Sequence, residues 1–256
     1  MTYFPSPCPV SAASFEGGAI AMVTARLDAE PEAVRESSAL LSEAERHRAR
    51  RLSFERDRRR FTVARARLRQ LLGERLGARP ESVELVYGEH GKPVLSQRFS
   101  ASGLHFNVSH CDDVAVYAFS SGREIGIDIE SVRAIPDADE IAKRFFSRRE
   151  YETYLALDPL DKPLGFFNCW TRKEAFIKAL GDGLRYPLDC IEVSLAPGQP
   201  AVILGVGSTT GNNCGWTLHS FLAEPELVGA IVVREFAREF DVQAGASRNV
   251  AHSLSS

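Results

Sequence analysis

The sequence predicts an α+β protein whose chain is divided into two similar halves. Amphipathic helical segments that begin at capping signals alternate with short runs of β-branched and aromatic residues. The chain has 256 residues, of which 44% are hydrophobic and 25% charged, so it is large enough to bury a sizeable core. Because each half supplies both helix and antiparallel-type strands, two packed α+β halves are expected.

The first helical segment begins at a capping box. Ser42 and Glu45 have the Ser-x-x-Glu spacing in which the two side chains satisfy backbone N–H groups at a helix start. A basic stretch, Arg46 to Arg60, leads from there into apolar residues at helical spacing that end at Leu76. Gly77 is expected to end this helix.

A second helical block follows in the middle of the chain. Ser147 and Glu150 have the spacing of another capping box, and Pro163 suits the first turn of a helix that Gly181 ends. Strands are expected on both sides of this block. Before it they are Val83 to Tyr87, Leu104 to Val108, Val114 to Phe119 and Glu124 to Ile129. After it they are Ile191 to Leu195, Val202 to Leu204, Trp216 to Phe221 and Val228 to Val233.

Composition excludes several classes of protein. The formal net charge is −3, from 31 basic and 34 acidic residues, so no overall field favours nucleic acid or an anionic membrane. No segment approaches the roughly 20 apolar residues of a membrane span, and Met1 to Val10 lack the pattern of a secretory leader. The five cysteines are scattered without Cys-x-x-Cys spacing, which argues against disulfides and zinc. We therefore expect a cytoplasmic protein whose tail, residues 244–256, is disordered.

Two carboxylates stand on one face of a predicted strand. In the segment from Ile125 to Glu130, alternation sends the three isoleucines to one side and Gly126, Asp128 and Glu130 to the other. Like charges two residues apart repel unless they are solvated or bridged, and a hard divalent cation is a natural bridge. The alternative is an ordinary, half-exposed strand.

Two further patterns place polar groups where they can reach a ligand. On the predicted helix, Glu174 and Lys178 are one turn apart on one face, as in a site or in a simple exposed ion pair. Ser109 and His110 end a predicted strand, and Lys92 lies in a turn between Gly91 and Pro93. A surface histidine and a turn lysine are the alternatives for the latter pattern.

Taken together, these patterns resemble the 4′-phosphopantetheinyl transferases of the surfactin-synthetase-activating type. The matching motifs, in the family's order, are Gly91-Lys92-Pro93, Phe106-Asn107-Val108-Ser109-His110, Ile125-Gly126-Ile127-Asp128-Ile129-Glu130, Phe145-Phe146-Ser147-x-x-Glu150 and Trp170-x-x-Lys173-Glu174-Ala175-x-x-Lys178. The resemblance covers about Leu40 to Leu195. It implies two similar halves in a pseudo-twofold arrangement with the active site between them, an N-terminal half of residues 1–122 that binds coenzyme A and a C-terminal half of residues 123–243 with the catalytic motifs.

The resemblance also implies a reaction. A serine of an apo acyl or peptidyl carrier protein attacks the β-phosphorus of coenzyme A, and adenosine 3′,5′-bisphosphate leaves. Asp128, Glu130 and Glu174 are the implied ligands of Mg²⁺, the implied cofactor. Glu174 is the implied base, acting directly or through a water on the ion, with Glu150 as a second acid near the ion. Lys178 is implied to hold pyrophosphate oxygens.

Coenzyme A binding is carried over to a set of basic and polar residues. They are Arg48, Arg60, Lys92, Ser109, His110, Lys173 and Lys178. Arg48 or Arg60 would hold the 3′-phosphate, since arginine pairs bidentately with phosphate. Glu45 occupies a position that is basic in some family members. For Lys173, the alternative to binding coenzyme A is a structural role.

The partner is expected to be a carrier protein or carrier domain. Such partners are generally acidic, so Arg144, Arg148 and Arg149, close to Phe145 and Phe146 in the sequence, are candidates for the docking face. The alternative is that both phenylalanines belong to the core. Fatty-acid, polyketide and nonribosomal-peptide carriers remain equally open, and we expect a monomer.

Two rival functions use the same residues differently. A magnesium-dependent phosphohydrolase or nuclease would use water in place of the carrier serine, and a coenzyme A-binding regulator would have a dead site. The five ordered motifs favour the transferase over the first rival. The presence of all three expected acids favours it over the second.

Overall fold

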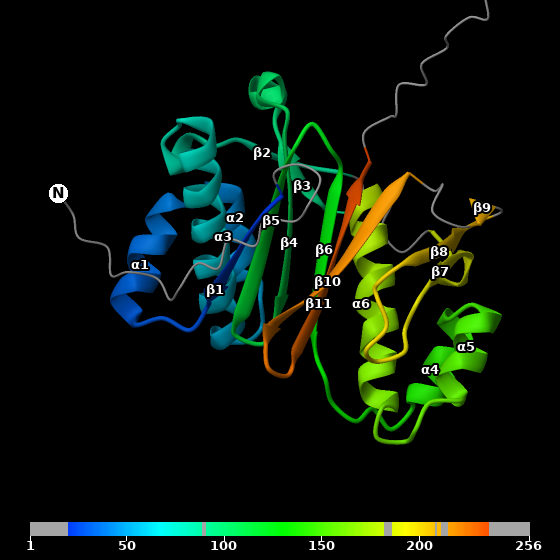
Figure 1. Cartoon of the computed structure of the whole chain (residues 1–256). Helices are drawn as coiled ribbons and strands as arrows, with labels where there is room; N and C mark the ends of the chain where they lie inside the picture. The colour runs from blue at the N-terminus through cyan, green and yellow to red at the C-terminus, as the bar shows by residue number, and fades with distance from the viewer. Residues whose placement is uncertain (1–19, 89–90, 182–185, 208, 211–214, 236–256) are drawn as a thin grey trace, which may run out of the picture.

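Two three-stranded antiparallel sheets form the centre of the structure, a computed structural model that describes residues 20–88, 91–181, 186–207, 209–210 and 215–235 (Figure 1). The first sheet has the strand order β1 (Ala21–Arg26), β5 (Val114–Ser121), β4 (Leu104–Cys111). The second has the order β10 (Trp216–Glu224), β11 (Leu227–Arg234), β6 (Ile125–Ser131). The predicted disordered tail, residues 244–256, lies outside the described residues.

The order of elements in the first half is repeated in the second. In the first half, β1 is followed by α1 (Pro31–Leu40), α2 (Glu43–Arg50) and α3 (Glu55–Leu76), and then by β2 (Leu85–Tyr87) and β3 (Pro93–Leu95). In the second half, β6 is followed by α4 (Ala138–Phe145), α5 (Arg148–Leu155) and α6 (Lys162–Leu180), and then by β7 (Ile191–Val193), β8 (Ile203–Val206) and β9 (Thr209–Thr210). The 3₁₀ turns are η1 (Pro80–Ser82), η2 (Gln97–Ser102) and η4 (Leu188–Cys190). Each half then ends with an antiparallel strand pair, β4–β5 in the first half and β10–β11 in the second. Helices and antiparallel strands are thus combined in each half, and the predicted α+β class is confirmed.

Both predicted capping boxes are present. Ser42 Oγ accepts the backbone N–H of Glu45 at 3.3 Å, and Glu45 Oε2 accepts the N–H of Ser42 at 2.8 Å. Ser147 and Glu150 make the same pair of bonds at 3.2 and 2.6 Å. Each box satisfies N–H groups that a helix start leaves without a helical partner.

The two long helices end where the sequence predicts, but the first helical segment is not continuous. Gly77 and Gly181 end α3 and α6 with φ angles of 62° and 83°, which glycine adopts without strain. The basic segment, however, forms two helices, because the chain turns between α2 and α3 and Phe54 is extended. This break folds α2 back onto α3.

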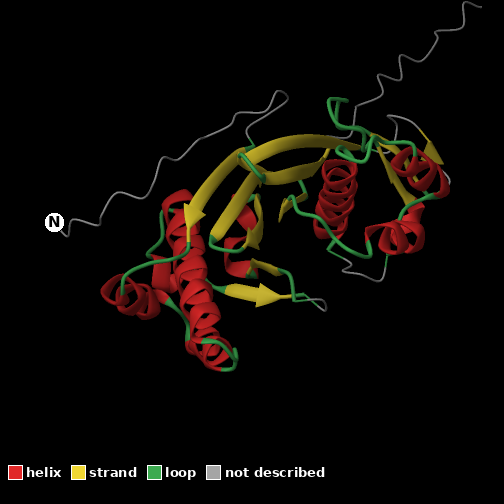
Figure 2. Cartoon of the chain, turned by 90° about the horizontal axis from the view of Figure 1, so that it is seen from below, coloured by secondary structure: helices red, strands yellow, loops and turns green. Residues whose placement is uncertain are grey.

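One face of β6 packs into the hydrophobic core that joins the two sheets. Ile125, Ile127 and Ile129 are buried in a cluster with residues of β5 and β11, so this face joins the two sheets. A separate core lies between α3 and the first sheet, and another surrounds α6 in the C-terminal half. Figure 2 shows the strands as an arch with a group of helices at each end.

The two halves meet where β4 lies beside β6. Asn107 Oδ1 accepts the backbone N–H of Ile127 at 2.9 Å, and Ser109 Oγ accepts that of Ile129 at 3.4 Å. Side chains of β4 thus take the place of the backbone carbonyls that a regular neighbouring strand would offer.

No helix in the described part of the chain combines the length and the apolar composition needed to cross a membrane.

A buried ion pair ties the helices of the C-terminal half together. Glu150 and Lys173 form an ion pair of 2.5 Å, and each side chain is 1% exposed. The second carboxylate oxygen of Glu150 accepts the N–H of Val193 in β7 at 2.7 Å. Its ammonium partner also donates to the carbonyl oxygens of Leu188 and Ile191, at 2.8 and 2.7 Å.

These contacts bear on two of the expectations drawn from the sequence. Glu150 was expected to act as an acid near the metal ion, and Lys173 to bind coenzyme A. Both groups are instead enclosed in the C-terminal half, where their hydrogen-bonding capacity is used by α5, α6 and β7. The structural alternative for Lys173 is therefore the one that the contacts favour.

Replacing Lys173 by methionine should destabilise the fold strongly, because it leaves the Glu150 carboxylate buried without its cation. We expect the free energy of unfolding to fall by about 3–5 kcal/mol, measured by urea denaturation. Arg148→Ala is the matched control: its side chain is 92% exposed, and a change of less than about 0.5 kcal/mol is expected. A loss below about 1 kcal/mol in Lys173→Met would contradict the assigned role.

Candidate active site between the two halves

Three polar side chains from three elements meet where the halves join. Asp128 on β6 is buried, and its Oδ1 accepts the hydroxyl of Ser109 on β4 at 2.9 Å. The ammonium of Lys178 on α6 donates to the same oxygen at 2.6 Å and to Ser109 Oγ at 3.0 Å. Residues separated by up to 69 positions in the sequence therefore form one hydrogen-bonded cluster.

The cluster exists because α6 lies directly on β6. A Cβ atom added at Gly126 would stand 2.0 Å from the carbonyl oxygen of Ala175 and 2.3 Å from the nitrogen of Ala179. Any side chain at this position would force the helix away from the strand. With glycine there, the helix comes close enough for Lys178 to reach Asp128.

Glu130 and Glu174 stand in the electrostatic field of the same cluster. Desolvation, followed by the negative charge of Asp128, raises the pKa of Glu174. The same two causes, in the same order, raise the pKa of Glu130, to which the charge of Glu174 also contributes. Three carboxylates thus interact with one another, and Lys178 offsets only part of their charge.

This arrangement fits a divalent cation by charge and by ligand type. Asp128 Oδ2 is buried and has no hydrogen-bond partner among the described residues, although buried carboxylate oxygens are normally satisfied. Oxygen atoms of carboxylates are the ligands that Mg²⁺ prefers. The described residues nevertheless contain no group of three histidine, cysteine or acidic side chains already arranged around one point.

His110 follows Ser109 and lies near the same charges. Desolvation, and then the neighbouring Lys178 cation, lower the pKa of the His110 imidazole, whereas Asp128 and Asp57 raise it more weakly. The result favours a neutral ring at neutral pH. A neutral ring has one N–H donor and one acceptor for a ligand.

The structure places Lys92 differently from the other residues expected to bind coenzyme A. Its ammonium donates to the carbonyl oxygens of Ile125 and Ala179, each at 3.3 Å, and to that of Lys178. Burial lowers the pKa of Lys92 to about 8. The turn between β2 and β3 thereby fastens the N-terminal half to the end of α6, where carbonyl groups lack helical partners.

The two predicted arginines differ in their availability. Arg60 is held by Asp28, whose two oxygens accept from its Nε and Nη2 at 2.7 and 2.9 Å. Arg48 is exposed on α2 and makes no ion pair within the described residues. Its guanidinium instead lies over the rings of Phe61 and Tyr87, with its carbon 5.6 and 6.0 Å from their centroids.

The residues expected to dock the carrier protein differ in their burial and in their contacts. Phe146 is buried in the core, but Phe145 is only half-buried and packs edge-on against Trp170, with 5.9 Å between ring centroids. Arg144 lies over the ring of Phe145 at 5.0 Å. The other two candidates are exposed and paired, Arg148 with Glu152 at 2.9 Å and Arg149 with Glu192 at 3.3 Å.

Sequence comparison gives the site a context. Residues 124–231 match the profile of the 4′-phosphopantetheinyl transferase superfamily, and residues 28–122 match that of the 4′-phosphopantetheinyl transferase N-terminal region. The solved structure of holo-[acyl-carrier-protein] synthase from Thermotoga maritima is 25% identical and covers 44% of this chain and 62% of its own, with a TM-score of 0.33.

Relatives of similar sequence are named as phosphopantetheinyl transferases. The 4′-phosphopantetheinyl transferase HetI of Nostoc sp. is 40% identical over 210 residues, which are 82% of this chain and 85% of HetI. The transferase Sfp of Bacillus subtilis is 36% identical over 60% of this chain and 66% of its own length. The human L-aminoadipate-semialdehyde dehydrogenase-phosphopantetheinyl transferase is 34% identical over 60% of this chain and 52% of its own. The chain therefore belongs to the 4′-phosphopantetheinyl transferase superfamily, as its motifs predicted.

Proposed function

We propose that this protein transfers the 4′-phosphopantetheine arm of coenzyme A to a serine of an apo acyl or peptidyl carrier protein. The products are the holo carrier protein and adenosine 3′,5′-bisphosphate, so the activity is that of a holo-[acyl-carrier-protein] synthase. The observation that carries this proposal is the cluster of Asp128, Ser109 and Lys178 at the junction of the halves. Membership of the family supports the reaction class.

Lys178 is proposed to bind the pyrophosphate of coenzyme A. Its side chain is 30% exposed, and its ammonium donates to the buried Asp128, so a ligand can reach the side chain while that bond is kept. A cation fixed by a buried carboxylate is already oriented before the ligand arrives, and such preorganised charge stabilises a transition state in which negative charge develops. The hydroxyl of Ser109 is hydrogen-bonded to both groups and helps to keep them in contact.

Glu174 is proposed to remove the proton from the carrier serine. Its raised pKa makes the ionised carboxylate a stronger base than an exposed glutamate. The serine oxygen attacks the β-phosphorus, the bond from that phosphorus to the bridging oxygen breaks, and the electron pair leaves with adenosine 3′,5′-bisphosphate. The serine proton passes to the Glu174 carboxylate.

Asp128, Glu130 and Glu174 are the residues proposed to hold Mg²⁺. The orphaned Oδ2 of Asp128 and the mutual repulsion that raises the pKa values of the other two support this assignment. When bound, the ion would supply positive charge to the pyrophosphate and to its leaving oxygen. The chain's own contribution is to keep three carboxylates within one another's electrostatic field despite their repulsion.

The proposed division of labour follows the two halves. Residues 1–122 would supply Arg48, Ser109 and His110 to coenzyme A, while residues 123–243 supply the acids and Lys178. Arg60 would have to share its guanidinium with Asp28, so we give it a smaller part in binding. Because one chain carries both halves, we propose a monomer. We also propose a cytoplasmic location.

The transfer is tested by the mass of the acceptor. Full-length protein is incubated with coenzyme A, magnesium and an apo carrier protein, and the carrier is weighed by intact mass spectrometry. We expect a gain of about 340 Da, the mass of one phosphopantetheine unit by its covalent formula. Glu174→Gln should slow the transfer by about 10²–10⁴-fold, and a chelator should abolish it.

Glu140→Gln is the matched control, because Glu140 is an exposed acid in the first turn of α4; its rate should equal that of the wild type. Coenzyme A binding without transfer to fatty-acid, polyketide or peptide carriers would favour a regulator. Release of adenosine bisphosphate without a carrier protein would favour a phosphohydrolase. Either result would overturn the proposal.

A further inference from the structure

Lys178 lies in the last turn of its helix. It is followed in α6 only by two residues, since the helix ends at Leu180 and Gly181 caps it. Helix ends fray, because their last carbonyl groups have no N–H partner within the helix. The ammonium that contacts Asp128 at 2.6 Å therefore belongs to a turn that needs support from outside α6.

Lys92 supplies that support from the N-terminal half. Its ammonium donates to the carbonyl oxygen of Lys178 itself and to that of Ala179, the latter at 3.3 Å. It also donates to the carbonyl oxygen of Ile125 in β6 at 3.3 Å, next to Gly126, where β6 and α6 lie in direct backbone contact. A cation at the C-terminal end of a helix also interacts favourably with the helix dipole. One side chain thus joins the N-terminal half, β6 and the last turn of α6.

The three contacts use the whole hydrogen-bonding capacity of the Lys92 ammonium. A lysine ammonium has three N–H donors and no acceptor, and three carbonyl oxygens accept from this one. Burial lowers the pKa of Lys92 to about 8, as expected for a cation surrounded by protein rather than water. A phosphate could therefore be bound by Lys92 only if one of these contacts were broken.

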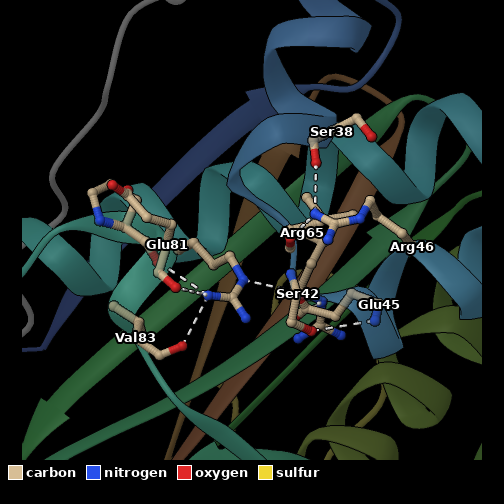
Figure 3. Close-up of polar contacts among 10 residues, drawn as sticks. Ser38, Ser42, Glu45, Arg46, Arg65, Glu81 and Val83 are labelled. Carbon is tan, nitrogen blue, oxygen red and sulfur yellow. Dashed lines mark hydrogen bonds and ion pairs between the residues drawn. The ribbon is translucent and has the colours of Figure 1, made fainter.

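The hairpin that carries Lys92 is itself fixed to the N-terminal half. The N–H of Gly88 donates to the carbonyl oxygen of Lys92 at 3.0 Å, across the turn between β2 and β3. Shortly before β2, the carbonyl oxygen of Val83 accepts from Arg69 Nη1 at 2.9 Å, and Arg69 Nε donates to the buried Glu45 at 2.7 Å. Figure 3 shows Glu45 in the corner between α2 and α3, with Val83 beside it. Lys92 therefore reaches α6 from a hairpin whose own position is held.

We propose that Lys92 is a positioning residue, which fixes the last turn of α6 so that Lys178 presents its ammonium to the pyrophosphate of coenzyme A. The ammonium of Lys92 itself makes no contact with the ligand. The proposal rests on the proposed function for the identity of the ligand and for the role of Lys178. It replaces the direct coenzyme A contact that the family resemblance implied for Lys92.

The test is a double-mutant cycle on the affinity for coenzyme A, which needs no carrier protein. Calorimetry in the presence of magnesium compares the full-length wild type, Lys92→Met, Lys178→Met and the double variant. Methionine resembles the apolar stem of lysine but has no donor, so we expect Lys92→Met to weaken binding by about 5- to 50-fold. In the Lys178→Met background the same change should cost less than about twofold, because the group that Lys92 positions is already absent.

Other roles of Lys92 predict other results. A direct phosphate contact would preserve most of the Lys92→Met loss in the Lys178→Met background, and so would a general loosening of the fold. Either result would overturn the inference, as would an unchanged affinity in Lys92→Met. If the methionine variant folds poorly, Lys92→Gln, which keeps a donor on a shorter side chain, replaces it in the cycle, with a smaller loss expected and the same dependence on Lys178.

Lys143→Met is the matched control, because Lys143 is exposed in the last turn of α4; its affinity for coenzyme A should equal that of the wild type. If Lys92 and Lys178 are coupled in binding but no carrier is modified, the proposed function fails and this inference stands. If a carrier is modified but the two effects are independent, the proposed function stands and this inference fails. No binding of coenzyme A by the wild type would overturn both.

Discussion

The contact between α6 and β6 at Gly126 is the constraint on which the candidate site depends. Helix and strand touch backbone to backbone there, with the position of a missing Cβ only 2.0 Å from a helical carbonyl oxygen. That approach brings Lys178 within 2.6 Å of Asp128 and keeps Glu174 in the field of the same carboxylate. Without this contact, the carboxylates of β6 would lie apart from Glu174 and Lys178 of α6.

Strand β6 joins the halves with its apolar face and carries two of the proposed metal ligands on its polar face. Its isoleucines are buried between the two sheets, while Asp128 and Glu130 alternate with them on the polar side. Ser109 of β4 serves both purposes, since its hydroxyl accepts from the backbone of β6 and donates to Asp128. The polar cluster is therefore as fixed as the junction itself.

Local signals in the sequence predicted much of this arrangement. Capping boxes and helix-ending glycines act over a few residues, so their outcomes follow directly from spacing. Alternation in β6 likewise placed Asp128 and Glu130 on one face. Strand β1, Ala21–Arg26, was not predicted, because only Val23 and Thr24 in this short segment are β-branched and none of its residues is aromatic.

What the sequence could not predict depends on partners distant along the chain. Lys173 is the neighbour of Glu174, and Glu150 lies in the motif before it, but the partners of both side chains lie in η4 and β7. Lys92 is a turn residue whose target, the end of α6, lies 86 positions away. Arg65 looks like part of a solvated basic helix until α2 folds back and places Glu45 beside it.

The most direct test is the coupling free energy between Asp128 and Lys178, measured by urea denaturation in a double-mutant cycle of Asp128→Asn and Lys178→Met. The cycle is performed in the wild-type background and again with Gly126→Ala. The close helix–strand contact predicts a coupling of about 1–3 kcal/mol in the first background and a large loss of it in the second, together with lower stability. A Gly126→Ala protein that kept both its stability and the full coupling would contradict the account.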